Sequence, residues 1–239
     1  MGKMEKVIRN IQQQILRIFA KYSKTFALSG GTALDLYYLH HRFSKDLDFF
    51  SPNYSIKEIN YLVDKITKET KQKIKLKEEL TARRIAKVRL YVVPIKGYDE
   101  PLKLDFVEDV ILKKPTIKRF NGVPVYSVKD IYIQKIFAIT GTHLVENHVG
   151  REIITGRKVA RDIFDIYMLS KKVCPLHKFL HNLPREQQRG MVQWYRSYSR
   201  QELKIDLLEL DIYDKDFDAS EMIFYLDNEI KKFIEMTLQ

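Results

Sequence analysis

The sequence is poor in the residues and runs that mark several protein classes. It has one cysteine, Cys174, among 239 residues, which excludes an intramolecular disulfide and fits a reducing cytoplasm. No apolar run approaches the roughly 20 residues that span a bilayer, and the charged N-terminal segment lacks the apolar core of a secretory signal. There is no internal repeat and no low-complexity tract. We therefore expect a cytoplasmic protein without a membrane segment.

What the chain has in excess is positive charge. Hydrophobic residues at 45% and charged residues at 31% are typical of a soluble globular protein, but the formal net charge is +11. Six lysines lie between residues 65 and 77, and further basic residues follow at 83–89 and 113–119. Such charge favours polyanionic partners, nucleic acid among them. A basic face that only contacts solvent explains it equally well.

Hydrophobic spacing predicts an α/β fold, with a mixed sheet and flanking helices followed by a helical C-terminal region. Helices are expected over 5–22, 32–41 and 56–70, and strands over 26–28, 46–50, 74–76, 84–94, 102–107 and 123–126. Asn121-Gly122 predicts a hairpin. Helices are expected over 127–141, 157–171 and in three segments of 176–239, with a loop at 142–156. The predicted domains are residues 1–126 and 127–239.

A glycine pair stands where a short apolar strand passes into a helix, within Ser29-Gly30-Gly31-Thr32. Free backbone N–H groups and the helix dipole favour an anion at such a place, here a triphosphate. Glycine is needed where the backbone adopts unusual dihedrals or approaches phosphates closely. The alternative is a plain tight turn, in which glycine is also common.

Three aspartates on two strands form a candidate metal site. Asp46 and Asp48 alternate along one strand, so their side chains share a face and lie about 6 to 7 Å apart. Asp105 projects from the otherwise apolar strand 103–107, where an unpaired buried carboxylate is costly. Together they would bind one or two Mg²⁺ ions, and Asp105 could help deprotonate an acceptor hydroxyl. The alternative for Asp105 is a partly exposed acid at a strand end.

In order, Ser29–Leu34, His41–Phe50 and Lys103–Asp105 resemble the successive motifs of the nucleotidyltransferase superfamily. More narrowly, they resemble the AbiEii/AbiGii-type toxin nucleotidyltransferases of toxin–antitoxin and phage-defence systems. Lys135, on the first helix after the sheet, and the Asp-x-x-Asp pair within Ala160–Leu169 continue the resemblance, which covers roughly residues 25–170. The family form has lysine where Arg161 stands, and the two side chains are not equivalent donors.

The resemblance implies an NTP-dependent nucleotidyltransferase toxin with Mg²⁺ as cofactor and a cognate antitoxin protein as partner. It would transfer a nucleoside monophosphate to an acceptor hydroxyl, and the basic surface favours RNA, particularly tRNA. The implied catalytic residues are Asp46, Asp48, Asp105, Lys135 and Asp162, with the helical region completing the cleft. The implied nucleotide-binding residues are Ser29, Gly30, Gly31, Thr32, Lys135 and Arg161, and the metal ligands are Asp46, Asp48 and Asp105.

Several positions keep two interpretations. Lys135 contacts the triphosphate or is a surface lysine. Asp162 or Asp165 orients Lys135 or contacts the nucleotide; alternatively, either one caps the helix or pairs with Arg161. Ser44 is a hydrogen-bonding residue ahead of the strand, or a regulatory site where modification would add negative charge beside the carboxylates.

Other candidate sites and functions also remain open. His143 and His148 lack the partners of a zinc site. Base stacking or a plain amphipathic helix explains the interleaved Arg189, Trp194, Tyr195, Arg196, Tyr198 and Arg200. The competing functions are a small-molecule nucleotidyltransferase of the antibiotic-modifying type and a non-catalytic nucleic-acid-binding protein.

Overall fold

A computed structural model describes residues 2–81, 86–141, 145–146, 152–153, 156–157 and 159–238. The chain divides into two compact units: unit 1 is Met1–Tyr38 with Phe43–Asp130, and unit 2 is Leu39–Arg42 with Ile131–Gln239. The last of the three changes of unit falls after residue 130, near the expected boundary after residue 126. The first two do not follow from the sequence, because nothing in it shows that residues 39–42 leave unit 1.

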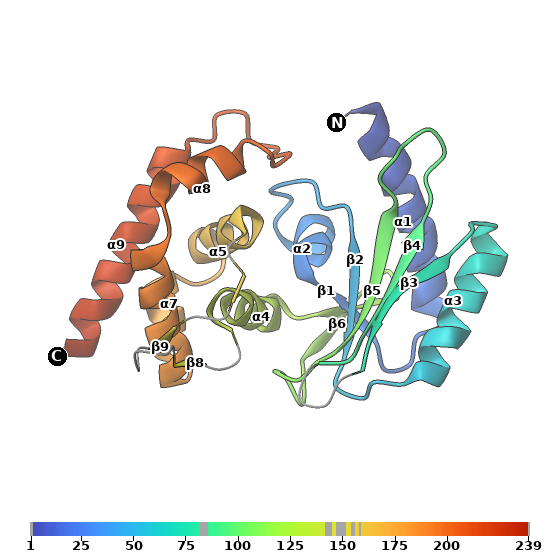
Figure 1. Ribbon diagram of the computed structural model, residues 1–239, viewed down its shortest axis with the longest axis horizontal. Coiled ribbons are helices and arrows are strands. Elements are labelled where there is room, and N and C mark those ends of the chain that lie inside the picture. Colours follow the sequence, from blue (N-terminus) through green and yellow to red (C-terminus); the bar gives the residue numbers. More distant parts are fainter. Residues whose placement is uncertain are drawn as a thin grey trace. The chain divides into compact units, whose positions relative to one another are not determined.

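Unit 1 is built on a seven-stranded mixed sheet, as predicted (Figure 1). The order is β3-β4-β5-β2-β1-β7-β6, in which β2 runs parallel to β5 and β1 parallel to β7, while the other neighbours are antiparallel. The strands are β1 (Ala27–Ser29), β2 (Leu47–Ser51), β3 (Lys75–Leu80), β4 (Val88–Val93), β5 (Leu102–Glu108), β6 (Ile117–Phe120) and β7 (Val123–Tyr126). The predicted start of β4 at residue 84 lies outside the described residues.

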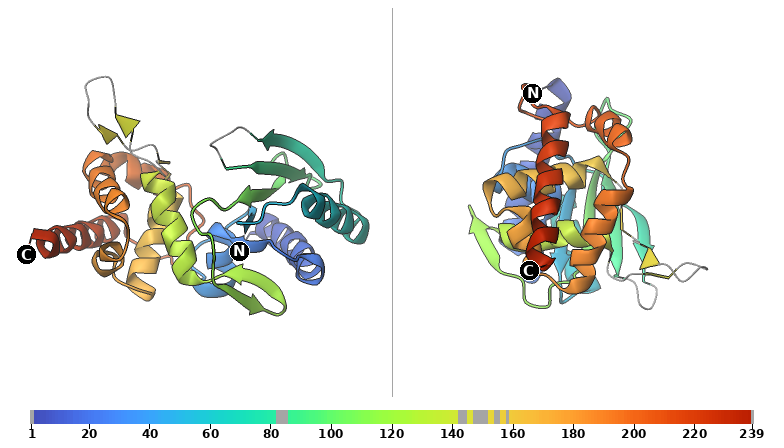
Figure 2. Two further views of the ribbon diagram at one scale, coloured as in Figure 1. Left: turned by 90° about the horizontal axis from the view of Figure 1, so that it is seen from below. Right: turned by 90° about the vertical axis from the view of Figure 1, so that its left-hand side faces the viewer.

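Helices α1 (Lys3–Tyr22) and α3 (Ile56–Thr70) lie side by side against one face of this sheet (Figures 1 and 2). Phe19 of α1 stacks on Phe49 of β2, with ring centroids 4.1 Å apart, and Phe49 lies 5.2 Å from the ring of Phe106 on β5. Since strand side chains alternate, this apolar face fixes which residues of β2 and β5 point to the other face.

The helix after β1 differs from its prediction. Ser29 ends the strand, α2 (Gly30–Ala33) begins at Gly30 rather than Thr32, and a π-helical turn, η1 (Leu34–Tyr38), ends the helix three residues early. His40 then has a positive φ of 48°, which a continuing helix could not accommodate. The hairpin at Asn121-Gly122 is confirmed, with φ of 49° and 83° joining β6 to β7.

Unit 2 is helical (Figure 2). Its elements are most of α4 (Val128–Thr140), then β8 (Val145–Glu146), β9 (Glu152–Ile153), α5 (Ala160–Lys172), α6 (Leu176–His181), α7 (Arg185–Ser197), α8 (Arg200–Leu207) and α9 (Ala219–Leu238). Four helices therefore follow residue 175 in the described chain, where three were predicted, and α5 begins three residues later than expected. Tyr132 of α4 stacks on Phe179 of α6 with ring centroids 3.8 Å apart, and Trp194 of α7 is buried.

The segment predicted as a loop, 142–156, contains the short pair β8–β9, and His143 and His148 within it lie outside the described residues. None of the helices that the structure describes combines the length and apolar character needed to cross a bilayer.

Candidate active site

Two of the three predicted carboxylates are direct neighbours in the sheet. Asp48 of β2 and Asp105 of β5 are paired in the parallel register, and Ser29 of β1 is paired with Asp48 on its other side. All three lie on the face opposite Phe49 and Phe106, because their neighbours in each strand pack toward α1. A polar row thus crosses three strands, and both carboxylates are only half-buried.

Asp46 immediately precedes β2, and its side chain contacts the neighbouring strand β5. Its carboxylate accepts a long hydrogen bond of 3.4 Å from the backbone N–H of Lys103 and lies 4.0 Å from the Lys103 ammonium. Lys103 alternates with Asp105 on β5, so Asp46 lies on the same face as the other two acids.

Gly30 makes a close approach to this row. Its φ is 71°, a value that L side chains rarely adopt, and a β-carbon there would lie 3.2 Å from Asp48 Cγ and closer still to Oδ2. Gly30 therefore does more than permit the turn, because the absence of a β-carbon leaves space for the Asp48 carboxylate.

The donor set fits a hard divalent cation such as Mg²⁺. Within the described ranges, no three His, Cys, Asp or Glu side chains are grouped as a ready-made metal cage. Mg²⁺ is usually bound by one or two carboxylates together with substrate phosphates and water, rather than by a cage made of protein alone. Asp48 and Asp105, on adjacent strands and half-exposed, match that pattern, with Asp46 next to them on the same face.

The side-chain hydroxyls of Thr32 and Ser44, near the glycine turn, form hydrogen bonds within the protein. Thr32 is fully buried; its Oγ1 donates to the Asp46 carbonyl and lies 2.9 Å from Ser44 Oγ. Ser44 is half-buried, and its own N–H donates to Asp35 Oδ2 at 3.1 Å. These contacts match the interpretation of Ser44 as a hydrogen-bonding residue ahead of the strand. They also show that the Thr32 side chain holds the segment that leads to Asp46.

In unit 2, Lys135 is buried between two carboxylates. Its Nζ lies 2.7 Å from Asp162 Oδ1 and 2.7 Å from Asp165 Oδ2, and both aspartates are fully buried on α5. Lys135 is therefore not a surface lysine, and its side chain is only 8% exposed. The two aspartates orient Lys135 and do not pair with Arg161, which points to solvent.

Asp165 has two further partners from the chain segment 39–42. Arg42 donates to both carboxylate oxygens, at 2.8 Å from Nε and 2.9 Å from Nη2, and His41 Nε2 lies 2.7 Å from Oδ1. Burial raises the pKa of the Asp165 carboxyl, but the charges of Arg42 and Lys135 outweigh it, so the net pKa lies well below the ordinary value for aspartate. Asp165 is thus a permanently charged anchor at neutral pH.

Asp162 is also fully buried, but one of its partners is exposed. Its Oδ2 lies 3.1 Å from Nη2 of Arg157, whose side chain is 53% exposed. Burial raises the pKa of the Asp162 carboxyl, and the charges of Lys135 and Arg157 lower it below the ordinary value. Arg157 is the cation of this cluster that also faces solvent.

Three of these residues had no role in the sequence-based site: His41, Arg42 and Arg157. A weak signal was available, since two buried acids on an otherwise apolar helix need more than one cation to offset desolvation. The sequence could not show which cations these were, because Arg42 lies 123 positions before Asp165.

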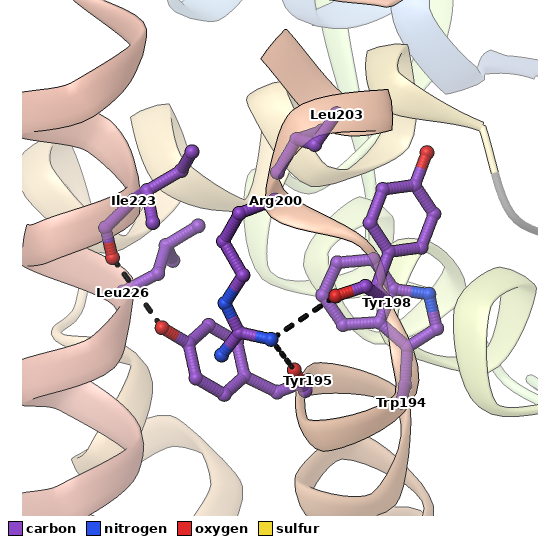
Figure 3. Close-up of a pocket in the computed structure, with 7 residues that line it drawn as sticks. All are labelled: Trp194, Tyr195, Tyr198, Arg200, Leu203, Ile223 and Leu226. Atoms are coloured by element: carbon purple, nitrogen blue, oxygen red, sulfur yellow. Dashed lines mark hydrogen bonds between the residues drawn. The ribbon is translucent and has the colours of Figure 1, made fainter.

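The aromatic and basic residues between 189 and 200, from α7 to the first residue of α8, do not form a stacking platform. Trp194, Tyr195 and Tyr198 are buried, and Arg200 covers the Tyr195 ring at 4.4 Å while it donates to the carbonyls of Tyr195 and Tyr198 (Figure 3). Tyr195 Oη donates to Asp227 at 2.8 Å. The simpler interpretation, an amphipathic helix with basic edges at Arg189 and Arg196, therefore holds.

The basic surface of unit 1 is open to solvent. Strand β3 is exposed along its whole length at the sheet edge and carries Lys75 and Lys77, and Lys113 and Lys114 are also exposed. This is compatible with both interpretations of the charge.

Comparison with known proteins gives the family. The model of the family described as "Nucleotidyl transferase AbiEii toxin, Type IV TA system" matches residues 14–238. No functionally curated protein matches the chain.

Two solved structures from Helicobacter pylori have the same fold. JHP933 is 21% identical, with 99% of this chain and 96% of that chain covered and a TM-score of 0.60. A protein provisionally described as a nucleotidyltransferase is 20% identical, with 99% of both chains covered and a TM-score of 0.60. Since the family match spans nearly the whole sequence, the chain belongs to the AbiEii family of toxin nucleotidyltransferases.

Proposed function

We propose that the protein uses Mg²⁺ to transfer a nucleoside monophosphate from an NTP to an acceptor hydroxyl on RNA, in particular tRNA. The hydroxyl oxygen bonds to the α-phosphate, and pyrophosphate leaves. The observation that carries the proposal is the pairing of Asp48 with Asp105 on adjacent strands, with Gly30 against the Asp48 carboxylate. Paired carboxylates supply oxygen ligands of the kind that Mg²⁺ takes together with substrate phosphates.

Asp46, Asp48 and Asp105 would hold the metal, one ion or two. Bound there, Mg²⁺ would supply charge stabilisation for the attacked phosphate and lower the pKa of the acceptor hydroxyl. Asp105 takes the proton of that hydroxyl, and backbone N–H groups of the turn at Gly30 and Gly31 bind phosphate oxygens. In this proposal Lys135 and Arg157 neutralise the negative charge of the β- and γ-phosphates, and Asp162 orients both side chains.

The wider role in this proposal is that of a growth-inhibiting toxin of the cytoplasm, active in phage defence and neutralised by a cognate antitoxin. The family description supports the toxin and its antitoxin, and the net charge of +11 supports a polyanionic acceptor. Ser44 is retained as a regulatory candidate: added charge in Ser44→Glu should lower transfer well below that of Ser44→Ala.

The test is incorporation of each of the four labelled NTPs into total RNA, total protein and small molecules, with Mg²⁺ or with EDTA. Asp48→Asn should abolish incorporation into RNA, whereas Asp64→Asn, on the exposed surface of α3, should not. Label in a small molecule favours the antibiotic-type enzyme. RNA binding without any incorporation favours the non-catalytic protein and contradicts the proposal.

A further inference from the structure

Gln12 of α1 is a fully buried amide among apolar helix residues. Its Nε2 donates two hydrogen bonds, to the carbonyl oxygens of Ser44 at 2.9 Å and Lys45 at 2.6 Å. Its Oε1 accepts one from Arg9 Nη1 at 2.9 Å. Both donors of the amide are therefore used on the two residues that immediately precede Asp46.

The segment Phe43–Asp46 belongs to no strand, so the sheet does not fix it. Arg9 Nη2 binds Asp35 Oδ2 at 2.6 Å, and the same oxygen accepts the Ser44 N–H. The Arg9 guanidinium also lies 4.9 Å from the centre of the Phe43 ring. The network reaches Ser44 at both its N–H and its carbonyl.

Side-chain donors thus reach three successive carbonyls: Gln12 binds those of residues 44 and 45, and Thr32 binds that of Asp46. An irregular segment in which three of the four carbonyls accept hydrogen bonds from buried side chains has little freedom to turn. The backbone conformation of this segment sets the direction of the Asp46 side chain. A change in its backbone dihedral angles would move the carboxylate away from the sheet face that carries Asp48 and Asp105.

We infer that Gln12 is a positioning residue, which holds the Asp46 carboxylate in place for the divalent cation through the carbonyls of Ser44 and Lys45. The inference rests on the proposed function of Asp46 as a metal ligand. Gln12 touches neither metal nor substrate. Loss of partners that orient a metal ligand typically costs 10- to 100-fold in metal affinity or activity.

The experiment uses the full chain and Mn²⁺ alone as the probe, measured by calorimetric titration at a temperature where circular dichroism shows each variant folded. Gln12→Met keeps the length of the side chain but removes both donors. Gln13→Met is the matched control, because Gln13 is the next residue of α1 and is exposed. Asp46→Asn reports the effect of losing the ligand itself.

Gln12→Met should weaken Mn²⁺ binding by about tenfold and raise the Mg²⁺ concentration needed for half-maximal transfer, while Gln13→Met changes neither. Gln12→Asn keeps the amide on a shorter side chain, so its Mn²⁺ affinity should lie between those of Gln12→Met and Gln13→Met. It replaces Gln12→Met in the comparison if that variant does not fold. An unchanged Mn²⁺ affinity in a folded Gln12 variant overturns the inference, even if its melting temperature falls. So does an unchanged affinity in Asp46→Asn.

Failure of the proposed function has a different signature. If wild-type protein transfers no nucleotide to RNA, the function is wrong, but the Mn²⁺ titration still compares Gln12→Met with Gln13→Met. The two results are therefore read from separate measurements.

Discussion

The backbone of Gly30 lies directly against the carboxylate of Asp48, at a φ of 71° and with no room for a β-carbon between them. Two separate demands, the dihedral angle and the contact, thus select glycine at one position. They can be separated by experiment, because Gly97 has a similar φ of 82° but open space around it.

Gly30→Ala should strongly reduce nucleotide transfer while lowering the free energy of unfolding only slightly. Both Gly30→Ala and Gly97→Ala incur a positive-φ cost of about 1 kcal/mol, measured by urea unfolding. Only Gly30→Ala displaces Asp48, so we expect transfer to fall on the order of 100-fold, while Gly97→Ala retains it. Equal activities in the two variants would contradict the assignment of Asp48 to the metal site.

Lys135→Met should destabilise the fold as well as abolish transfer. It leaves the fully buried Asp162 and Asp165 without their shared cation, which for a buried ion pair costs about 3 to 5 kcal/mol. Lys129→Met is the control, since Lys129 is exposed on the same helix. Chemical unfolding of both variants measures the difference, and a cost below that of Lys129→Met would mean that the cluster does not stabilise unit 2.

Acid should weaken the fold through Asp165. Its pKa is lowered in the folded state, so its stabilising contribution is complete above the ordinary aspartate pKa of about 3.9 and is lost as pH falls through the lower folded value. The free energy of unfolding of wild type and Asp165→Asn should therefore differ most at neutral pH and converge below about pH 4. Urea titrations between pH 2 and 7 measure this. A gap that stays constant with pH would show that Asp165 is not the titrating group.

Arg157 and Arg161 offer a direct comparison of two exposed arginines near the start of α5. Arg157 contacts the Lys135–Asp162 pair and Arg161 points to solvent, so Arg157→Gln should raise the KM for NTP by about tenfold, the effect of losing one charged contact. Arg161→Gln should leave it near the wild-type value. Arg161→Gln should leave thermal stability unchanged, because its side chain is exposed. Arg157→Gln should lower it, because the fully buried Asp162 then loses one of its two cations. The reverse order of KM values would restore Arg161 to the nucleotide site that the sequence motif implies.

The sequence predicted most strands and the two long helices of unit 1, but not the π-helical turn that follows α2. Strand alternation is local, so the shared face of Asp46 and Asp48 could be derived from residue order alone. The register that sets Asp48 opposite Asp105 could not, because it depends on a parallel pairing between distant strands. The alternation therefore predicted which acids share a face, but not how they are arranged across the strands.

The partners of the buried charges were the least predictable part. Lys135 lies on a helix rich in isoleucine, where the sequence allows burial or exposure equally. Its environment is decided by α5 and by the contacts of Arg42, all of them long-range. Gln12 was missed for a similar reason: a polar residue in an amphipathic helix gives no local sign that its amide binds carbonyls more than thirty positions away.

The short passage of residues 39–42 through unit 2 makes both units discontinuous in the gene. A fragment that begins at residue 131 would carry Asp165 without Arg42 and His41, the partners that make its burial tolerable. A fragment that ends at residue 130 would keep those two side chains without their carboxylate. Recombination at a single point therefore could not exchange either unit intact. Any exchange of the segment Ser44–Asp48 would have to keep His41 and Arg42, just before it, matched to Asp165.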